Sequence, residues 1–322
     1  MDLSFLNNIN GIEIKPNARL AEYTTFRVGG TCPAIIICRK PEQIIQAITA
    51  LVNKGIEFII IGGGSNILVS DKGIRQIVIQ YLSSPSIIKK EGNELIISAG
   101  SILDDVCQFA AEKGLTGINF LSGIPGTIGG AIVGNAGAFG KQIGDAVKSV
   151  FVIDSSASCK TIYMDELKFG YRDSIFKKNN GLIIISVRLS LKAYDKKYLQ
   201  EEREQILKLR MERHPDIKKT PCAGCFFKNI PTRNNESKKE SAGKLIEKAG
   251  ARKLDSGKAG LFEKHANIII NPDAKASAQE IFDLSEKIHG LVKEKFGIEL
   301  IREVRLIGHF KGMPAGVNNP IW

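Results

Sequence analysis

Residues 123–140, GIPGTIGGAIVGNAGAFG, decide the fold class that we expect for this chain of 322 residues. Seven of these eighteen residues are glycine. Because each glycine in a regular element costs about 0.5–1 kcal/mol relative to alanine, so dense a run needs a compensating interaction. The apolar residues Ile124, Ile128, Ile132 and Val133 are untypical of a flexible linker. We therefore predict that this backbone lies against a planar or phosphorylated cofactor, with a tightly packed helix crossing as the alternative.

A second glycine-rich loop, GGGSN at residues 62–66, follows a predicted βαβ unit. Residues 33–39 are typical of a buried strand, Pro41 begins an amphipathic helix, and residues 57–61 form the next expected strand. The loop after that strand offers free backbone N–H groups and two short polar side chains, which suit a pyrophosphate. It has neither the lysine of a P-loop nor G-x-G-x-x-G spacing, which argues against a nucleotide triphosphatase and a simple Rossmann domain.

The later chain alternates between strand and helix patterns. Strands are expected at residues 147–154 and 182–191, and a surface helix at residues 194–214 precedes a smaller α/β unit. In that unit Ser277 begins a helix with capping-box spacing, and residues 299–307 form the last expected strand. The expected fold class is therefore α/β (α+β), with one domain at residues 1–193 and a second at residues 194–322.

Composition restricts the partners. The chain has 45 Lys and Arg against 34 Asp and Glu, a formal net charge of +11, which favours anionic ligands but is equally compatible with an ordinary solvated surface. The charge is spread, without a basic arm carrying interleaved aromatics, so we expect small phosphorylated ligands rather than nucleic acid. No secretory signal or membrane-spanning run is evident, and the scattered cysteines suit reduced thiols, so we expect a cytoplasmic protein. The oligomeric state stays open, with a monomer favoured.

Cys222 and Cys225 form a C-x-x-C without a second pair at suitable spacing, so no metal site is expected. A regulatory disulfide between these two cysteines stays open, because C-x-x-C pairs can be redox active.

Several short motifs occur in a characteristic order between about residue 20 and residue 308. They are TTFRVGG at 24–30, GGGSNILV at 62–69, GIPGTIGG at 123–130, NAGAFG at 135–140, YRDS at 171–174, FKN at 227–229, AGKLIE at 242–247, HAN at 265–267 and EVR at 303–305. Each motif is weak alone. Together they resemble the UDP-N-acetylenolpyruvoylglucosamine reductase family of flavoenzymes.

The resemblance implies a two-part FAD-binding domain of the vanillyl-alcohol-oxidase (PCMH) type, followed by a substrate-binding domain. It also implies that NADPH reduces FAD and that hydride then passes from flavin N5 to the enolpyruvyl group, giving UDP-N-acetylmuramate for peptidoglycan synthesis. The nearest alternative is another FAD-dependent oxidoreductase of this fold, acting on an alcohol or hydroxy acid. A non-catalytic nucleotide-binding or nucleic-acid-binding protein is suggested only by the net charge.

The resemblance also assigns residues. Arg172 and Glu303 would activate the substrate carboxylate and Cys225 would donate the proton, at a position where the family uses serine. Tyr171, Lys228 and Asn229 would contact the substrate, and Lys228 as a point charge suits its diphosphate. The expected cofactor contacts come from the two glycine loops: Gly62, Gly63, Gly64, Ser65, Asn66, Ile67, Gly123, Pro125, Gly126, Gly129, Gly130, Asn135 and Gly137.

Overall fold

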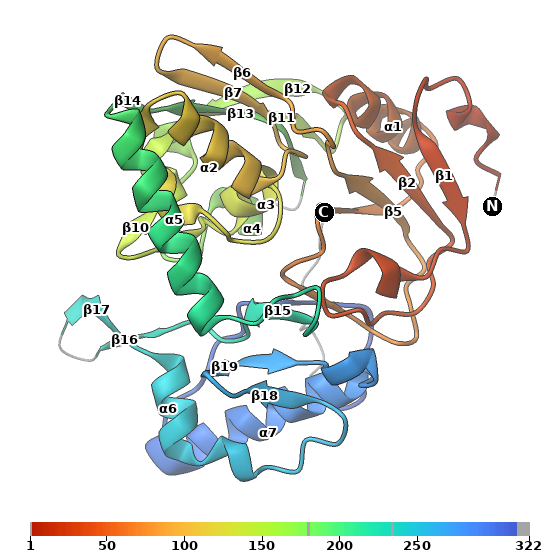
Figure 1. The fold of residues 1–322 in the computed structure, drawn as a ribbon. Helices are drawn as coiled ribbons and strands as arrows, with labels where there is room; N and C mark the ends of the chain where they lie inside the picture. Colours follow the sequence, from red (N-terminus) through yellow and green to blue (C-terminus); the bar gives the residue numbers. More distant parts are fainter. Residues whose placement is uncertain (1, 179–180, 233–234, 314–322) are drawn as a thin grey trace.

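The computed structural model describes residues 2–178, 181–232 and 235–313. Its helices and strands form three groups, two of them in the first part of the chain and the third in the last part (Figure 1). Each group has a sheet with helices beside it, so the expected α/β (α+β) class is confirmed.

The first group is a four-stranded sheet in the order β1-β2-β5-β3. Its strands are β1 (Glu13–Pro16), β2 (Ala34–Cys38), β5 (Ile77–Tyr81) and β3 (Phe58–Ile61). Strands β2, β5 and β3 are parallel, as the βαβ pattern predicts, and every residue of β2 and β5 is buried. Helix α1 (Pro41–Asn53) contacts both β2 and the second sheet, so it joins the first two groups.

The second group is a five-stranded antiparallel sheet in the order β12-β11-β13-β7-β6. Its strands are β12 (Cys159–Tyr163), β11 (Val147–Asp154), β13 (Leu182–Ser190), β7 (Glu94–Ser98) and β6 (Ile88–Glu91). Its helices are α2 (Leu103–Glu112), α3 (Ile128–Val133), α4 (Ile175–Lys178) and α5 (Lys196–Arg213). Helix α3 lies inside the glycine-rich segment and contacts β7 and β13, while α5 contacts α2.

The third group has a three-stranded antiparallel sheet, in the order β15-β19-β18, with two helices. The strands are β15 (Cys222–Cys225), β19 (His265–Ile270) and β18 (Gly260–Phe262), and the helices are α6 (Ala242–Ala249) and α7 (Ala278–Phe296). Ser277 caps α7 by accepting a hydrogen bond from the backbone N–H of Glu280, whose carboxylate accepts one from Ser277. The predicted capping box is therefore confirmed.

Four shorter strand pairs lie outside these three sheets. They are β4 (Ile67–Val69) with β20 (Arg305–Ile307), β8 (Leu115–Thr116) with β14 (Lys192–Ala193), β9 (Gly137–Ala138) with β10 (Lys141–Gln142), and β16 (Ile230–Thr232) with β17 (Asn235–Glu240).

The end of the described chain returns to its beginning. Strand β20 pairs in parallel with β4, directly after the GGGSN loop. Phe26 and Val28 are buried in the hydrophobic core of the third group, and the side-chain amide of Asn271 donates to the Phe26 carbonyl at 2.8 Å. These contacts hold the third group beside the glycine loops, which brings residues near 225 and 303 to the same place.

One predicted strand is shorter than expected. Residues 299–304 are irregular, and only Arg305–Ile307 form a strand. The backbone of the irregular part is bonded to the segment after β15, with a single bridge between Phe227 and Arg302. An alternating apolar and polar pattern does not distinguish such a segment from a regular strand. The domain boundary between residues 193 and 194 stays a prediction.

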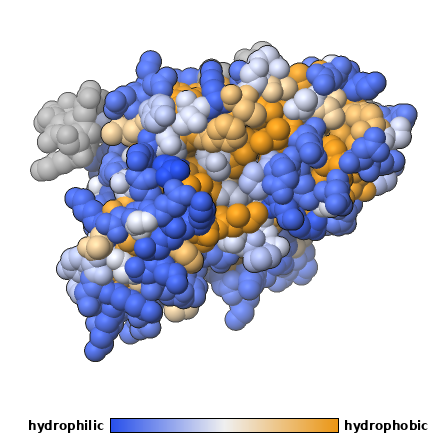
Figure 2. Space-filling view, turned by 90° about the horizontal axis from the view of Figure 1, so that it is seen from above, coloured by the Kyte–Doolittle hydropathy of each residue, from blue (hydrophilic) through white to orange (hydrophobic). Residues whose placement is uncertain are grey.

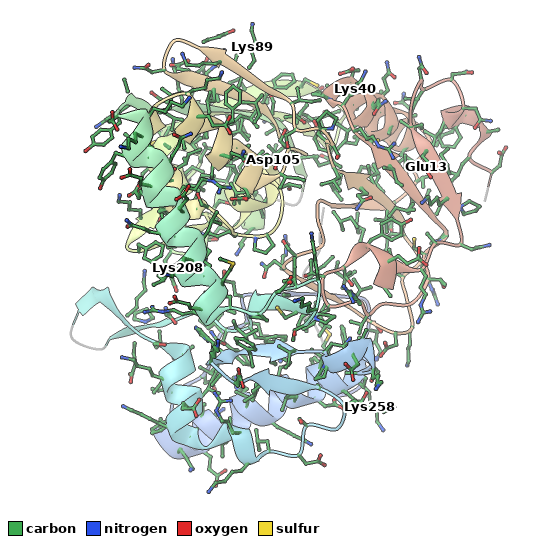
Figure 3. All side chains as sticks on the ribbon, in the orientation of Figure 1. Glu13, Lys40, Lys89, Asp105, Lys208 and Lys258 are labelled. Carbon is green, nitrogen blue, oxygen red and sulfur yellow. The ribbon has the colours of Figure 1, made fainter. Side chains whose placement is uncertain are left out.

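Apolar surface gathers between hydrophilic parts of the face shown in Figure 2. The charged residues labelled in Figure 3, such as Lys40, Lys89 and Lys258, are exposed. None of the helices in the described ranges is both long enough and apolar enough to cross a bilayer.

Candidate active site

Arg172 lies at the tip of a tight turn before α4. Gly170 and Asp173 close this turn with two reciprocal backbone hydrogen bonds of 3.0 and 3.1 Å. Arg172 has φ +52°, in the left-handed region where glycine is favoured and other residues store about 1–3 kcal/mol of strain. Its guanidinium donates to the Gly137 carbonyl at 2.8 Å and, more weakly, to the Asn135 carbonyl at 3.4 Å. The strained turn therefore aims the arginine at the glycine-rich segment.

Glu303 meets this guanidinium from the other end of the chain. Its Oε1 lies 2.9 Å from Arg172 Nε, and both side chains are 21% exposed. The backbone N–H of Glu303 donates to the Phe226 carbonyl at 2.8 Å, and the backbone N–H of Lys228 donates to the Ile301 carbonyl at 2.8 Å. The segment that carries Glu303 is thus held against the segment that follows β15.

Cys225 ends β15 and is half-buried. Burial, with a smaller contribution from the nearby Glu303 carboxylate, raises the pKa of its thiol to about 12, although the charge of Arg172 acts in the opposite direction. Its Sγ lies 4.0 Å from His265 Nε2, and Nδ1 of this ring accepts from the backbone N–H of Asn267 at 3.3 Å. Because the pKa lies far above neutrality, Cys225 is a protonated thiol at pH 7.

Tyr171, Lys228 and Asn229 lie around the same turn. Lys228 Nζ donates to the Arg172 carbonyl at 3.3 Å, and the Asn229 backbone N–H donates to Tyr171 Oη at 3.3 Å. The Asn229 side chain accepts from the backbone N–H of Ala242, at the start of α6. The structure therefore brings together all six residues expected for catalysis and substrate binding.

The two glycine loops pack directly on each other. A Cβ at Gly62 would lie 2.6 Å from Thr127 Oγ1, and one at Gly126 would lie 2.6 Å from Ser65 Oγ. Ser65 also donates to the Pro125 carbonyl at 3.0 Å. Because a side chain at Gly62 would collide with Thr127 and one at Gly126 would displace the Ser65 hydroxyl, the two loops meet as one surface rich in backbone N–H and carbonyl groups. A flavin dinucleotide fits such a surface, because its pyrophosphate needs close backbone donors.

The remaining expected cofactor residues divide by exposure. Gly63, Asn66, Gly123 and Gly137 are half-buried, and Pro125 and Gly130 are exposed. Gly64, Ile67, Gly129 and Asn135 are buried and contact other parts of the protein.

Two of the buried residues have internal partners that account for their identity. A Cβ at Gly129 would lie 2.9 Å from the Ala99 carbonyl oxygen, so this glycine permits close packing of α3. The Asn135 side chain donates to Gln142 Oε1 and to the Gly170 carbonyl, both at 2.8 Å, and so links the glycine segment to the Arg172 turn. The Asn66 side chain donates to the Glu303 carbonyl at 3.3 Å, which connects the GGGSN loop to the same site.

Sequence reasoning missed two cations at this site. Lys177 donates to the Arg172 carbonyl at 2.8 Å, and burial lowers the pKa of its amine to about 8. Arg210, on α5, donates to the carbonyls of Ser122 and Phe120, and burial lowers its pKa. Neither position carries a spacing that separates it from the many surface lysines and arginines of the chain.

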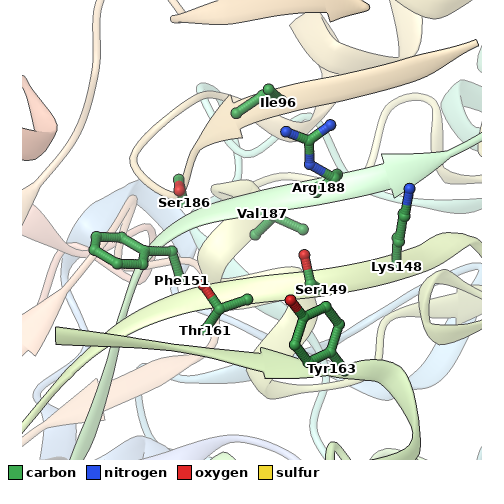
Figure 4. Close-up of a pocket in the computed structure, with 9 residues that line it drawn as sticks. All are labelled: Ile96, Lys148, Ser149, Phe151, Thr161, Tyr163, Ser186, Val187 and Arg188. Atoms are coloured by element: carbon green, nitrogen blue, oxygen red, sulfur yellow. The ribbon is translucent and has the colours of Figure 1, made fainter.

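A pocket on the five-stranded sheet lies elsewhere (Figure 4). Its lining includes Lys148 and Arg188 but no residue assigned from the motifs. Both cations are already paired: Lys148 with Glu94, and Arg188 with Glu91 and Glu94 at 3.1 and 2.7 Å. The described residues contain no group of three or more side chains suited to holding a metal ion. We therefore place the functional site at the Arg172 turn.

Comparison with protein-family models matches both parts of the chain. Residues 32–162 match an FAD binding domain, and residues 215–307 match the C-terminal domain of UDP-N-acetylenolpyruvoylglucosamine reductase. The expectation from the motifs that the chain binds FAD is therefore confirmed by the match to an FAD binding domain.

Whole-chain comparisons agree. The chain is 36% identical to UDP-N-acetylenolpyruvoylglucosamine reductase of Caldanaerobacter subterraneus, over 91% of this chain and 93% of that protein. It is 35% identical to the reductase of Clostridium botulinum strain Eklund 17B, over 94% and 96%. It is similar in structure to the reductase of Thermus caldophilus, with a TM-score of 0.75 at 30% identity, over 92% and 99%. The chain therefore belongs to the UDP-N-acetylenolpyruvoylglucosamine reductase family.

Proposed function

We propose that this protein uses NADPH and FAD to reduce UDP-N-acetylenolpyruvoylglucosamine to UDP-N-acetylmuramate. One observation carries the proposal. Arg172 Nε and Glu303 Oε1, from residues far apart in the chain, lie 2.9 Å apart beside the half-buried Cys225 thiol, and both residues are linked to the glycine loops. A cation, a carboxyl group and a proton donor thus meet at one place, which is the set that reduction of an enolpyruvyl ether requires.

FAD, when bound, supplies the hydride. Arg172 and Glu303 would hold the substrate carboxylate so that it accepts the charge that develops at the adjacent carbon. The carboxyl group of Glu303 lies beside the Arg172 guanidinium, so both side chains can reach the same substrate carboxylate. In this proposal Glu303 acts as a hydrogen-bond donor to the substrate carboxylate.

Cys225 would then deliver its thiol proton to the carbon next to the carboxylate. The high pKa of this thiol keeps it protonated at neutral pH, and a thiol is a stronger acid than the serine hydroxyl that the family uses there. After transfer, the thiolate would regain a proton from solvent. Lys228, Tyr171 and Asn229 would bind the nucleotide part, with the Lys228 ammonium against the diphosphate.

The test uses purified holoprotein without oxygen. Excess NADPH should bleach the flavin absorbance, and the enolpyruvyl sugar nucleotide should restore it with formation of the lactyl ether. As a matched control, UDP-N-acetylglucosamine lacks the enolpyruvyl group and should leave the flavin reduced. Recovery with the control, or no recovery with the enolpyruvyl compound, would overturn the proposal. Flavin reduction by alcohols or hydroxy acids would favour the alternative oxidoreductase.

A further inference from the structure

The Arg172 carbonyl oxygen accepts hydrogen bonds from two lysines. Lys177 Nζ donates to it at 2.8 Å from α4, and Lys228 Nζ donates at 3.3 Å from the segment after β15. Two ammonium groups that converge on one neutral oxygen repel each other, so this arrangement needs a compensating interaction. This oxygen belongs to Arg172, whose left-handed backbone conformation is one that glycine and asparagine adopt more easily than arginine.

Helix α4 is well placed to act on this turn. The buried Ser174 donates its hydroxyl to the Val133 carbonyl at 2.8 Å, at the end of α3, and the backbone N–H of Lys177 donates to the Ser174 carbonyl at 3.1 Å. The backbone of Lys177 is therefore tied to Ser174, and Ser174 in turn is bonded to the glycine-rich segment. Its ammonium reaches back from this anchor to the Arg172 carbonyl.

We propose that Lys177 is a positioning residue that holds Arg172 in its left-handed conformation, so that the guanidinium faces Glu303 and the substrate carboxylate. This inference rests on the role given to Arg172 under the proposed function. Lys177 acts through the Arg172 backbone. Lys228 contributes a second, longer bond to the same oxygen and is expected to be withdrawn toward the substrate diphosphate, which leaves Lys177 as the permanent support.

The charge environment of Lys177 makes its contribution dependent on pH. Burial and the neighbouring Lys228 and Arg305 lower the pKa of the Lys177 amine to about 8, whereas Glu303 and Asp173 act in the opposite direction. As pH rises through about 8, the ammonium loses its proton and the charge-assisted bond to Arg172 becomes a weaker neutral one. We expect the substrate-dependent re-oxidation of the flavin to slow over the same range.

The test measures the two half-reactions of the holoenzyme separately by stopped flow. In Lys177→Met the re-oxidation by the enolpyruvyl substrate should slow at least about tenfold, because a displacement of about 1 Å costs up to about 100-fold. Flavin reduction by NADPH should change by less than about twofold, since Arg172 acts on the other substrate. Lys177→Arg should restore re-oxidation and remove its decline near pH 8, because a guanidinium stays protonated.

Lys178→Met is the matched control. It removes the same charge from the next residue of α4, where the ammonium is exposed and pairs with Asp173 at 2.8 Å. Both half-reactions should match those of the unmodified enzyme. If Lys177→Met slows both half-reactions equally, or slows neither, the positioning role is wrong. Arg172→Ala separates the two ideas: unchanged re-oxidation in that variant would overturn the proposed function itself, whatever Lys177 does.

Discussion

Replacement of Cys225 by alanine should block the protonation step while leaving flavin reduction intact. With a pKa of about 12, about one thiol in 10⁴ is ionised at pH 8, so nearly every molecule carries the proton to be transferred. Loss of a general acid typically costs about 10²–10⁴-fold, and we expect re-oxidation by the enolpyruvyl substrate to slow by this factor. Cys225→Ser keeps a donor at the same place and should retain most of the rate.

The assay is a single turnover. Enzyme reduced by NADPH is mixed with the enolpyruvyl substrate in deuterated buffer, flavin absorbance is followed, and the product is examined for deuterium at the carbon next to the carboxylate. The unmodified enzyme and Cys225→Ser should form labelled product rapidly, and Cys225→Ala should not. A Cys225→Ala enzyme that re-oxidises and labels product at the normal rate would refute the proton-donor role.

Alkylation checks the protonation state independently. At pH 8 an ordinary thiol of pKa about 8.5 is ionised about 10³-fold more than Cys225. The greater intrinsic nucleophilicity of a high-pKa thiolate recovers about 30-fold, so Cys225 should react with iodoacetamide about 10²-fold more slowly than an ordinary thiol. The exposed Cys159 provides the internal reference by peptide mass spectrometry. Equal rates at the two cysteines would contradict a half-buried, protonated Cys225.

Further predictions concern the cofactor loop, a half-buried histidine and the ion pair. Gly62→Ala should lower the Tm of the FAD-free protein, because the new Cβ would lie 2.6 Å from Thr127 Oγ1. Gly63→Ala makes only ordinary contacts and should keep this Tm but weaken FAD binding. Equal Tm values for the two variants would contradict this prediction. Burial lowers the pKa of His214 to about 4, so the unfolded state binds the proton first and stability is lost as pH falls from about 6.5 toward 4. In guanidinium titrations at pH 7 and pH 5, His214→Asn should lose less stability than the unmodified protein; an unchanged difference would be evidence against it. Glu303→Ala should slow substrate-dependent re-oxidation about 10²-fold or more, and Glu303→Gln less, because the amide still donates; equal rates in both variants would oppose a donor role.

Elements with clear hydrophobic periodicity were predictable from the sequence. The buried run of β2, the amphipathic pattern of α1 and the capping box of α7 each specify their element locally. Helix α3 was expected only under the alternative of a tightly packed helix crossing, because its glycines have low helix propensity and the helix depends on close packing of Gly129 against Ala99. Residues 299–304 are the opposite case: their sequence pattern is typical of a strand, but their backbone is irregular and makes an isolated bridge to Phe227.

The site was predictable only where the motifs of a known family mark it. No spacing rule connects Arg172 with Glu303, because their contact depends on the return of β20 to β4 across the whole fold. Lys177 was missed for the same reason. Its role follows from a hydrogen bond to a strained carbonyl, and neither the strain nor the bond is visible in the order of residues.

The most direct test of the central claim is the visible spectrum of the reduced holoprotein before and after addition of UDP-N-acetylenolpyruvoylglucosamine without oxygen. We predict oxidised-flavin bands in the purified protein, bleaching by NADPH, and full recovery when the enolpyruvyl compound is added. A protein that stays colourless after incubation with FAD, or a bleached flavin that this compound leaves unchanged, would contradict the claim.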